Sequence, residues 1–340
     1  MSYLLITQDF PPGFIGGIAA WATDLAQALH GAGHDVTVLC RNTKHSRGPD
    51  SQQPYRIVRM IGRSWSRFQG TWAHLHARRF LAPDVHVLTA TWNLATELVG
   101  PCANKGATLS VAFHGSDLTQ VTEPTKGLTE VAAAAKQLLP VSRFLAGELA
   151  RLVPETAGDP RVQILPMPLP IPAAPANGPR SGLLSVTRLT PLKGVDRAIR
   201  LAAELGETLT VVGDGPEKDA LPDGPHVTWV GRKSRDELAA LYARTKGVVL
   251  LPRATEDGMG AEGLGLCLLE AAAQGAIPIG WRIGGVAEAV GPGILLDDPD
   301  RYDVPAIRRT LDDPSLPAKC HAFVAGAHGP ERTLQVLARP

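Results

Sequence analysis

Short apolar runs alternate with segments of helical periodicity along most of the 340-residue chain. Such runs predict strands of a parallel sheet, because helices cover both faces of that sheet and leave little room for polar side chains. In the first half we expect strands at residues 3–7, 36–40, 85–89, 108–113 and 137–141, and helices at 17–30 and 142–152. Ser142 stands where it can cap the second of these helices. The pattern is typical of a doubly wound α/β domain.

A proline-rich stretch at residues 165–179 interrupts this alternation. Proline fixes φ and removes a backbone donor, so the stretch predicts a stiff linker and neither a helix nor an interior strand. The alternation then resumes, with strands expected at 182–187, 208–212, 226–230, 247–251 and 276–280 and helices at 194–205, 234–244, 264–274 and 331–338. Ser234 and Glu237 match the capping-box pattern at the start of one of these helices.

The chain therefore predicts an α/β protein with two doubly wound, Rossmann-like domains that face each other across a cleft. We expect residues 1–172 to form the first domain and 173–325 the second, with a C-terminal helix within 326–340 that packs back toward the first domain. Two domains of about 150 residues each can both bury a core of their own. Ligands of such sheets bind beyond the carboxyl ends of the strands, so the loops there are the candidate sites.

Composition excludes several classes of protein. The net charge of +1 argues against a nucleic-acid-binding protein, which usually carries a strongly basic patch. The four cysteines lie far apart and follow no metal-binding spacing, which suits reduced thiols in a cytoplasmic protein. The first residues lack the pattern of a signal peptide, and no apolar run approaches the roughly 18 residues of a membrane span. We therefore expect a cytoplasmic protein.

The segment from Glu262 to Glu270 combines two carboxylates with a glycine-containing turn at 263–266 that opens a predicted helix. Backbone N–H groups at a helix start favour an anion such as a diphosphate, and glycines let it come close. Glu262 could accept hydrogen bonds from sugar hydroxyls, and Glu270 could hold a diol such as a ribose. The alternative is that both carboxylates are solvated and the glycines only cap a helix. Against it, Glu270 lies in the otherwise apolar run 266–273, where an unpaired carboxylate is costly to bury.

Two cations, Arg188 and Lys193, follow the first strand expected in the second domain. Five residues apart at a strand end and a helix start, they can converge on a diphosphate. They would also neutralise the leaving group as a glycosidic bond breaks. A single cation in a loop is usually only solvated, but the position at the carboxyl end of a strand favours a binding role.

Two further candidate sites lie at strand ends of the first domain. His114 follows the strand at 108–113 and could bond a sugar hydroxyl or carry a proton, or could be a structural histidine in a turn. Gly16 and Gly17, between the first strand and the first helix, would allow close approach of a phosphate or an acceptor. The dinucleotide fingerprint G-x-G-x-x-G does not follow the first strand, which argues against a dinucleotide-binding Rossmann site. The ten histidines include no H-E-x-x-H pair, and we expect no metal site.

Taken together, these clusters resemble the retaining GT-B glycosyltransferases of family GT4, and the similarity extends over nearly the whole chain. The motifs that carry it are, in chain order, Pro11-Pro12 with Gly16-Gly17, Leu25, Leu29 and Gly33-His34 with Val36, His114-Gly115-Ser116-Asp117, Arg188-Leu189 with Lys193-Gly194, Val212-Gly213-Asp214-Gly215-Pro216, and Glu262-Gly263-Leu264-Gly265-Leu266 with Glu270. Each motif alone is weak, but the set in this order is specific. Leu264 replaces a commoner phenylalanine, and the segment 255–261 is longer than the minimal version of the motif.

The resemblance implies a hexosyl-type transferase that moves a sugar from a nucleotide-sugar donor to an acceptor hydroxyl with retention of anomeric configuration. Its product would be a glycan, a glycolipid or a natural product. Family members generally need no metal, so no cofactor is expected besides the nucleotide sugar, and a front-face route is plausible without an evident enzymic nucleophile. Two alternatives stay open here, namely a sugar-nucleotide epimerase of the same fold and a non-catalytic protein that binds sugar nucleotides.

The resemblance also implies roles for matching positions. Arg188 and Lys193 would bind the donor diphosphate. Glu262, with the backbone of the turn that follows it, would hold the transferred sugar and the phosphate. Glu270 would bind the ribose, and His114 would contact the sugar near the reacting carbon. The base would lie beside the loop that contains Gly231, Trp229 and Arg232.

The segment 59–80 mixes arginines with aromatic side chains. The residues concerned are Arg63, Arg67, Arg78, Arg79, Trp65, Phe68, Trp72 and Phe80. A basic, aromatic helix can lie on an anionic membrane, so one interpretation is peripheral contact with the inner face of the membrane. The alternative is an ordinary amphipathic helix of the first domain with its charges turned outward.

Overall fold

The computed structural model describes residues 1–12, 16–42, 50–61, 65–221, 224–254 and 262–339. The chain forms two compact units. Unit 1 comprises Met1–Pro170 together with His328–Pro340, and unit 2 comprises Ile171–Ala327. Unit 1 is therefore built from two segments that are distant in the sequence, whereas unit 2 is continuous.

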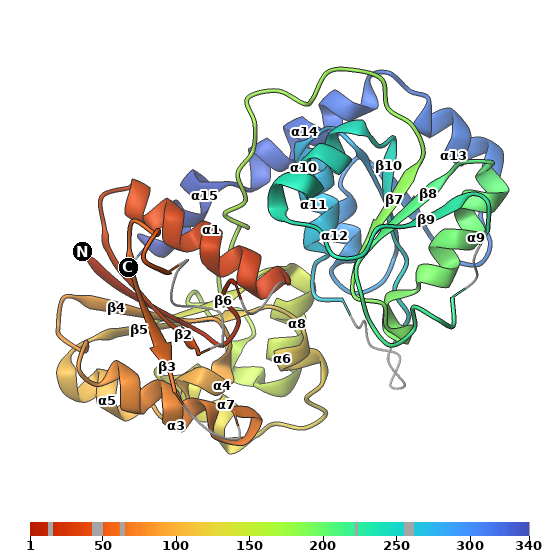
Figure 1. Ribbon diagram of the computed structural model, residues 1–340. Coiled ribbons are helices and arrows are strands. Elements are labelled where there is room, and N and C mark those ends of the chain that lie inside the picture. The colour runs from red at the N-terminus through yellow and green to blue at the C-terminus, as the bar shows by residue number, and fades with distance from the viewer. Residues whose placement is uncertain (13–15, 43–49, 62–64, 222–223, 255–261, 340) are drawn as a thin grey trace. The chain divides into compact units, whose positions relative to one another are not determined.

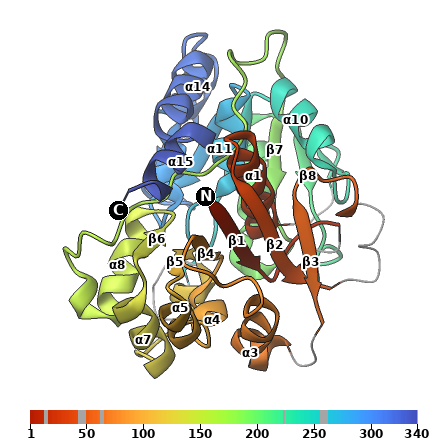
Figure 2. The same ribbon diagram turned by 90° about the vertical axis from the view of Figure 1, so that its left-hand side faces the viewer.

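Unit 1 contains a six-stranded, wholly parallel sheet in the order β3-β2-β1-β4-β5-β6, which can be followed across Figure 2. The strands are β1 (Ser2–Thr7), β2 (Asp35–Arg41), β3 (Arg56–Met60), β4 (Val85–Thr89), β5 (Thr108–Phe113) and β6 (Gln137–Pro140). Five of the six residues of β1 are buried, as expected of a central strand that is covered on both faces. The chain reverses its direction of growth between β1 and β4, which makes that position the switch point of the sheet.

Helices cover both faces of this sheet. They are α1 (Gly17–Gly31), α3 (Trp65–Ala77), α4 (Trp92–Ala95), α5 (Val99–Lys105), α6 (Ser116–Thr119), α7 (Lys126–Ala134), α8 (Arg143–Leu152), the 3-10 turn η1 (Pro154–Thr156) and α15 (Pro330–Leu337). In Figure 1, α1 and α15 lie on one side of the sheet and α3, α4, α5 and α7 on the other. Helix α1 packs through Trp21, Leu25 and Leu29, which repeat every four residues and are fully buried.

A chain of buried polar side chains crosses the sheet of unit 1. His86 Nε2 lies 2.7 Å from Ser110 Oγ, and Ser110 donates to Gln137 Oε1 at 3.0 Å. The Gln137 amide donates in turn to the carbonyl oxygens of Val336 (3.0 Å) and Arg339 (3.2 Å) at the end of α15. Burial lowers the pKa of His86 to about 4, so its imidazole is neutral near pH 7. The polar chain thus ties β4, β5 and β6 to the C-terminal helix.

Unit 2 repeats the architecture with a parallel sheet in the order β12-β11-β10-β7-β8-β9. Its strands are β7 (Leu183–Val186), β8 (Leu209–Val212), β9 (Val227–Trp229), β10 (Gly247–Leu250), β11 (Ile277–Trp281) and β12 (Ile294–Leu296). The helices are η2 (Pro191–Lys193), α9 (Val195–Leu205), α10 (Arg235–Arg244), α11 (Leu266–Ala273), α12 (Val286–Val290), α13 (Val304–Leu311) and α14 (Leu316–Ala327). In Figure 1, α11, α12 and α14 lie on one side of this sheet and α9 and α13 on the other.

The predicted fold class is confirmed, and each strand expected from an apolar run is observed with its ends shifted by at most one residue. Strands β3 and β12 were not predicted. The capping box of α10 is present, because Ser234 accepts from the Glu237 N–H while the Glu237 carboxylate accepts from the Ser234 N–H. The proline-rich stretch 165–179 is extended chain, as expected. Arg180 fastens its end to unit 2 by donating to the carbonyl oxygens of Ala176 and Gln274.

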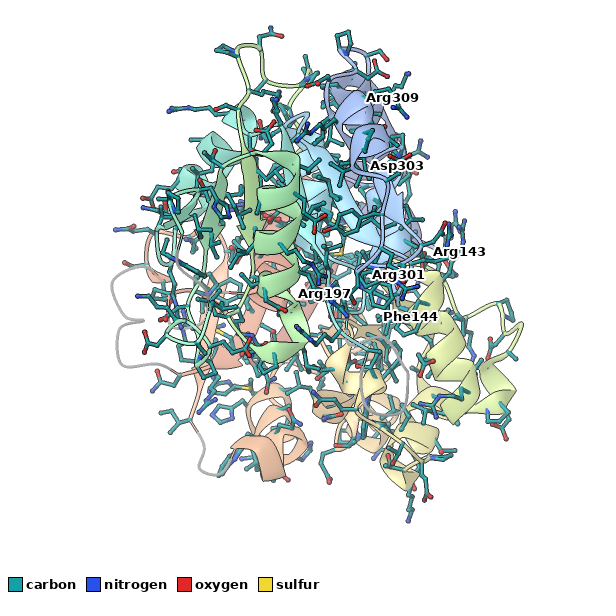
Figure 3. All side chains as sticks on the ribbon, turned by 90° about the vertical axis from the view of Figure 1, so that its right-hand side faces the viewer. Arg143, Phe144, Arg197, Arg301, Asp303 and Arg309 are labelled. Carbon is teal, nitrogen blue, oxygen red and sulfur yellow. The ribbon has the colours of Figure 1, made fainter. Side chains whose placement is uncertain are left out.

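Two segments differ from what the sequence predicts. The segment 59–80 is not one helix, because Arg59 and Met60 complete β3 before α3 begins. Residues 304–327, where no helix was predicted, form α13 and α14. Asp303 caps α13 by accepting from the Ala306 N–H, as its position in Figure 3 illustrates. The sequence of α14 mixes small residues with few large apolar ones, which obscured the buried positions that repeat every four residues.

Candidate functional site

In unit 2 the chain reverses its direction of growth between β7 and β10, so the loops after these two strands flank the switch point where such sheets bind ligands. Arg188 and Lys193 lie in the loop after β7, and Glu262 lies on the connection from β10 to α11. The structure brings Lys193 and Glu262 into direct contact. This contact joins the two loops into one cluster.

Lys193 and Glu262 form the central pair of this cluster. The Lys193 ammonium donates to Glu262 Oε2 at 2.6 Å, and the two side chains keep 20% and 18% of their surface exposed. A short, charge-assisted bond of this kind orients both groups. Partial exposure leaves both accessible to a ligand, and an incoming diphosphate would compete with Glu262 for the lysine.

Gly194 explains how Lys193 reaches this position. It follows the 3-10 turn η2 in the left-handed conformation, with φ at 63°. A Cβ atom at Gly194 would lie 1.9 Å from the carbonyl oxygen of Leu251, just beyond β10. The turn after β7 therefore packs directly on the backbone that leaves β10, and only glycine fits the contact.

Arg253 braces the same turn, and the sequence analysis did not identify it. Its backbone N–H donates to the Leu192 carbonyl oxygen at 2.9 Å, and its Nη1 donates to the Pro191 carbonyl oxygen at 2.9 Å. The guanidinium also donates to the two carboxylate oxygens of Asp196 at 2.9 and 2.6 Å. These bonds hold the pKa of the Asp196 carboxyl below its usual value. Arg197, visible at the start of α9 in Figure 3, donates to the Pro252 carbonyl oxygen at 3.2 Å.

Arg188 differs from these fastened cations. Its side chain is exposed, and among the described residues its guanidinium has no hydrogen-bond or ion-pair partner. The neighbouring Leu189 N–H donates to the Asp214 carbonyl oxygen at 3.1 Å, which joins the loop after β7 to the loop after β8. An exposed guanidinium on an anchored loop is well suited to bind a phosphate.

Gly285 packs against the turn between Glu262 and α11. The Gly285 N–H donates to the Glu262 carbonyl oxygen at 3.1 Å, and a Cβ atom at Gly285 would lie 1.9 Å from the carbonyl oxygen of Gly263. Gly265 caps the helix, and Leu266 is its first residue. The predicted glycine-containing turn at a helix start is present. The long segment 255–261 lies outside the described residues.

Glu270, which lies in an otherwise apolar run, has a hydrogen-bond partner in Tyr242. The Tyr242 hydroxyl donates to Glu270 Oε2 at 2.9 Å, and Tyr242 is only 2% exposed. Burial, together with the negative charge of Glu270, raises the pKa of Tyr242 well above its ordinary value. The predicted solvated alternative is therefore wrong for Glu270, which is fixed on α11 by a residue of α10.

Gly231 lies just beyond β9, in the left-handed conformation with φ at 65°. Its carbonyl oxygen accepts from the Gly213 N–H at 2.9 Å, so the loops after β8 and β9 are linked. Arg232 and Asp214 form an exposed ion pair at 3.6 Å beside it. A Cβ atom at Gly231 would meet no described heavy atom within 4 Å. Packing therefore does not demand glycine at position 231, although its left-handed conformation favours it.

In unit 1, His114 follows β5 and packs edge-on against Trp21, with the ring centroids 4.4 Å apart. Asp117 Oδ1 shapes the turn by accepting from the N–H groups of His114 (3.0 Å) and Gly115 (2.8 Å). Among the described residues, His114 Nε2 and Asp117 Oδ2 are buried without a hydrogen-bond partner. Burial lowers the pKa of His114 to about 3 and raises that of Asp117 to about 6. A neutral imidazole can bond a hydroxyl but is a poor proton carrier near pH 7.

Gly16 and Gly17 begin α1 beside the switch point of unit 1. Both are exposed, and a Cβ atom at Gly16 would meet no described heavy atom within 4 Å. Packing therefore does not demand glycine at position 16. Residues 13–15 of the same loop lie outside the described residues.

The basic and aromatic segment is only partly available for a membrane. Arg59, at the start of the segment, is 10% exposed and forms an ion pair with Asp50 at 2.5 Å, so it is not available at the surface. Phe80 lies between the guanidinium groups of Arg56 and Arg79, 5.1 and 5.0 Å from its ring centroid. Arg63 and the side chains of Trp65, Arg67 and Phe68 lie outside the described residues. Within the described chain, no helix has the length and apolarity needed to cross a membrane.

Two family models match the chain. Residues 15–163 match the family described as Glycosyltransferase Family 4, and residues 172–324 match the family described as Glycosyl transferases group 1. The gap between the two ranges contains the start of the proline-rich stretch.

Relatives and solved structures agree with these matches. The glycogen synthase of Mycobacterium tuberculosis is 28% identical, with 93% of this chain and 87% of the relative covered. The GDP-mannose-dependent alpha-(1-6)-phosphatidylinositol monomannoside mannosyltransferase of the same species is also 28% identical, with 84% and 82% covered. The sucrose-phosphate synthase of Thermosynechococcus elongatus has a TM-score of 0.75 at 19% identity, with 98% and 96% covered. HepE of Anabaena, in complex with UDP and glucose, has a TM-score of 0.75 at 15% identity, with 99% and 98% covered.

Proposed function

We infer that this chain, which belongs to the GT4-type glycosyltransferases of the GT-B fold, transfers a sugar to an acceptor hydroxyl with retention of anomeric configuration. That it is a nucleotide-sugar-dependent glycosyltransferase follows from its relatives. The acceptor hydroxyl and the retention are the proposal. The observation that carries it is the contact between Lys193 and Glu262 at the switch point of unit 2.

Unit 2 is proposed to bind the donor. Lys193 and the exposed Arg188 would bind the diphosphate, because two cations on one loop match its two phosphates. Glu262, released from Lys193, would accept hydrogen bonds from hydroxyls of the transferred sugar, and N–H groups at the start of α11 would face the phosphate. Glu270 would bind the ribose hydroxyls, and the base would lie beside Gly231.

Bond cleavage would leave the diphosphate with an extra negative charge. Arg188 and Lys193 would stabilise this charge without reorganisation, because the turns that carry them are already fastened. This supports a reaction without a metal ion. Among the described residues, no group of three or more histidine, cysteine, aspartate or glutamate side chains could hold one.

In unit 1, His114 is proposed to bind a sugar hydroxyl through Nε2. Its lowered pKa and its orphaned nitrogen support hydrogen bonding and argue against proton transfer. Gly16 and Gly17 would admit the acceptor or a phosphate close to the start of α1. The relatives are named for glycogen, sucrose phosphate and a phosphatidylinositol mannoside, so glycans, small sugars and glycolipids are the acceptor classes to test.

The proposal is tested with a panel of UDP-, GDP- and ADP-sugars in buffer that contains EDTA. A donor at 100 times its Kd stabilises a protein by ~2.7 kcal/mol, so the thermal shift identifies the base. Arg188→Ala is expected to weaken nucleoside diphosphate binding about tenfold by calorimetry. Arg309→Ala, an exposed arginine on α13 in Figure 3, should leave it unchanged. A product with inverted configuration, or activity only with added metal, would contradict the proposal, and an epimer formed without acceptor would identify the alternative enzyme.

We further propose that unit 1 makes peripheral contact with anionic membranes near the end of α3, at the cytoplasmic face. The exposed Arg78 and Arg79 beside Phe80 support this contact, as does the relative named for a phosphatidylinositol mannoside. Each basic residue contributes about 1 kcal/mol at such a surface. We expect sedimentation with phosphatidylserine vesicles at low salt and about 30-fold weaker binding for the Arg78→Ala/Arg79→Ala variant, which loses two such contributions. Wild-type protein that stays in the supernatant would rule the contact out.

A further inference from the structure

We propose that Tyr242 is a positioning residue that sets the enzyme's affinity for the ribose hydroxyls of the donor, by fixing the carboxylate of Glu270. The inference rests on the proposed role of Glu270 as the ribose ligand. Tyr242 belongs to none of the matched motifs, and it lies on a different helix from Glu270. It would act without touching the nucleotide.

The geometry limits what the carboxylate can do. The Tyr242 hydroxyl donates to Oε2 of Glu270 at 2.9 Å, and this partly buried bond joins α10 to α11. A carboxylate offers about four acceptor positions on two oxygens. The bond to Oε2 restrains the rotation of the carboxylate plane. Loss of that bond removes this restraint on the orientation that two neighbouring hydroxyls require.

The Tyr242 hydroxyl keeps its proton near neutral pH. Burial and the neighbouring carboxylate raise the pKa of Tyr242 far above neutral pH, so the phenol stays protonated. The Tyr242 hydroxyl therefore remains a hydrogen-bond donor near neutral pH.

The guanidinium of Arg180 joins the two helices that carry Tyr242 and Glu270. Arg180 Nη1 donates to the carbonyl oxygen of Tyr242 at 3.1 Å and to that of Thr245 at 3.3 Å. Arg180 Nη2 donates at 2.5 Å to the carbonyl oxygen of Gln274, which follows α11. The ends of α10 and α11 are thus joined through Arg180, and the tyrosine and the glutamate keep their separation. Such rigidity distinguishes a positioning pair from two side chains that merely touch.

The experiment compares ribose with a sugar that lacks both hydroxyls. The probes are UDP and GDP, each paired with its 2′,3′-dideoxy form, with Kd measured by calorimetry. In the wild type we expect the dideoxy form of the preferred nucleotide to bind at least 20-fold more weakly. In Tyr242→Phe we expect the ribonucleotide to bind about 5- to 20-fold more weakly, with the dideoxy form unchanged within twofold. The ratio between the two ligands should therefore shrink.

Matched variants separate the possible failures. Tyr55→Phe removes a buried hydroxyl of unit 1 that has no partner among the described residues, and it should leave the ratio unchanged. Glu270→Gln should abolish most of the ratio. If it does not, the proposed ribose role of Glu270 is wrong. If Glu270→Gln abolishes the ratio but Tyr242→Phe weakens both ligands equally, or neither, the positioning role is overturned while the proposed function stands. The dideoxy affinity also reports whether Tyr242→Phe keeps the folded site.

Discussion

Lys193→Ala is expected to lower kcat/KM for sugar transfer by about 100- to 1,000-fold, the usual loss when one preorganised donor to a developing oxyanion is removed. The reason is local. Lys193 is the cation that the turn after β7 and the end of β10 hold in place, and its removal also leaves Glu262 without its 2.6 Å partner. Initial rates with the preferred nucleotide sugar measure the effect.

Lys246→Ala is the matched control for this variant. Lys246 forms a comparable ion pair with Glu207 at 2.7 Å, but it precedes β10 and so lies at the amino end of the strand. We expect its loss to change kcat/KM by less than threefold. Equal losses in the two variants, or more than a tenth of wild-type activity in Lys193→Ala, would contradict the assigned role.

Gly285→Ala is expected to destabilise the protein by about 2–4 kcal/mol and to weaken nucleoside diphosphate binding more than tenfold. The added Cβ would lie 1.9 Å from the Gly263 oxygen and 2.9 Å from Leu264 Cα, all in backbone that has no flexible end to move. Because φ at Gly285 is −79°, alanine strains nothing by itself, and the whole effect comes from displacement of the turn that follows Glu262. Urea unfolding and calorimetry measure the two losses.

Gly147→Ala is the corresponding control. Gly147 lies inside α8, and its Cβ would meet no described heavy atom within 4 Å. Alanine should therefore stabilise the helix by about 0.4–1 kcal/mol, because the unfolded chain loses more freedom than the folded one. If Gly285→Ala were as harmless as Gly147→Ala, the turn would not depend on Gly285.

The sheets and the central ion pair were predictable because parallel strands impose simple rules. All four residues of β10 are buried, so its apolar run alone identifies the strand. Lys193 and Glu262 follow two strands of one parallel sheet, and the carboxyl ends of such strands share an edge. The sequence therefore predicts that these two side chains lie at the same edge of the sheet, where the structure shows them in contact.

The supporting residues were not predictable, because their contacts depend on how helices and loops pack. Tyr242 is 28 positions from Glu270 on another helix, and nothing in the sequence of α10 distinguishes it from an ordinary core tyrosine. Arg253 and Asp196 are 57 positions apart, and each alone resembles a solvated charge. Helix α14 escaped notice for a related reason, since its buried positions are separated by small residues that weaken the apolar period.

The bonds from Gln137 to α15 carry a consequence for synthesis on the ribosome. Most of unit 1 emerges early, yet the buried amide of Gln137 finds its acceptors, the carbonyl oxygens of Val336 and Arg339, only after nearly two hundred further residues have been added. Until then β6 keeps a polar group without its partner and α1 lacks its neighbour α15. Unit 2 is one continuous segment, so it is complete as soon as its own residues have been made. The first unit to be made is therefore the last to be finished, and its earlier state is the one in which chaperones would meet this chain.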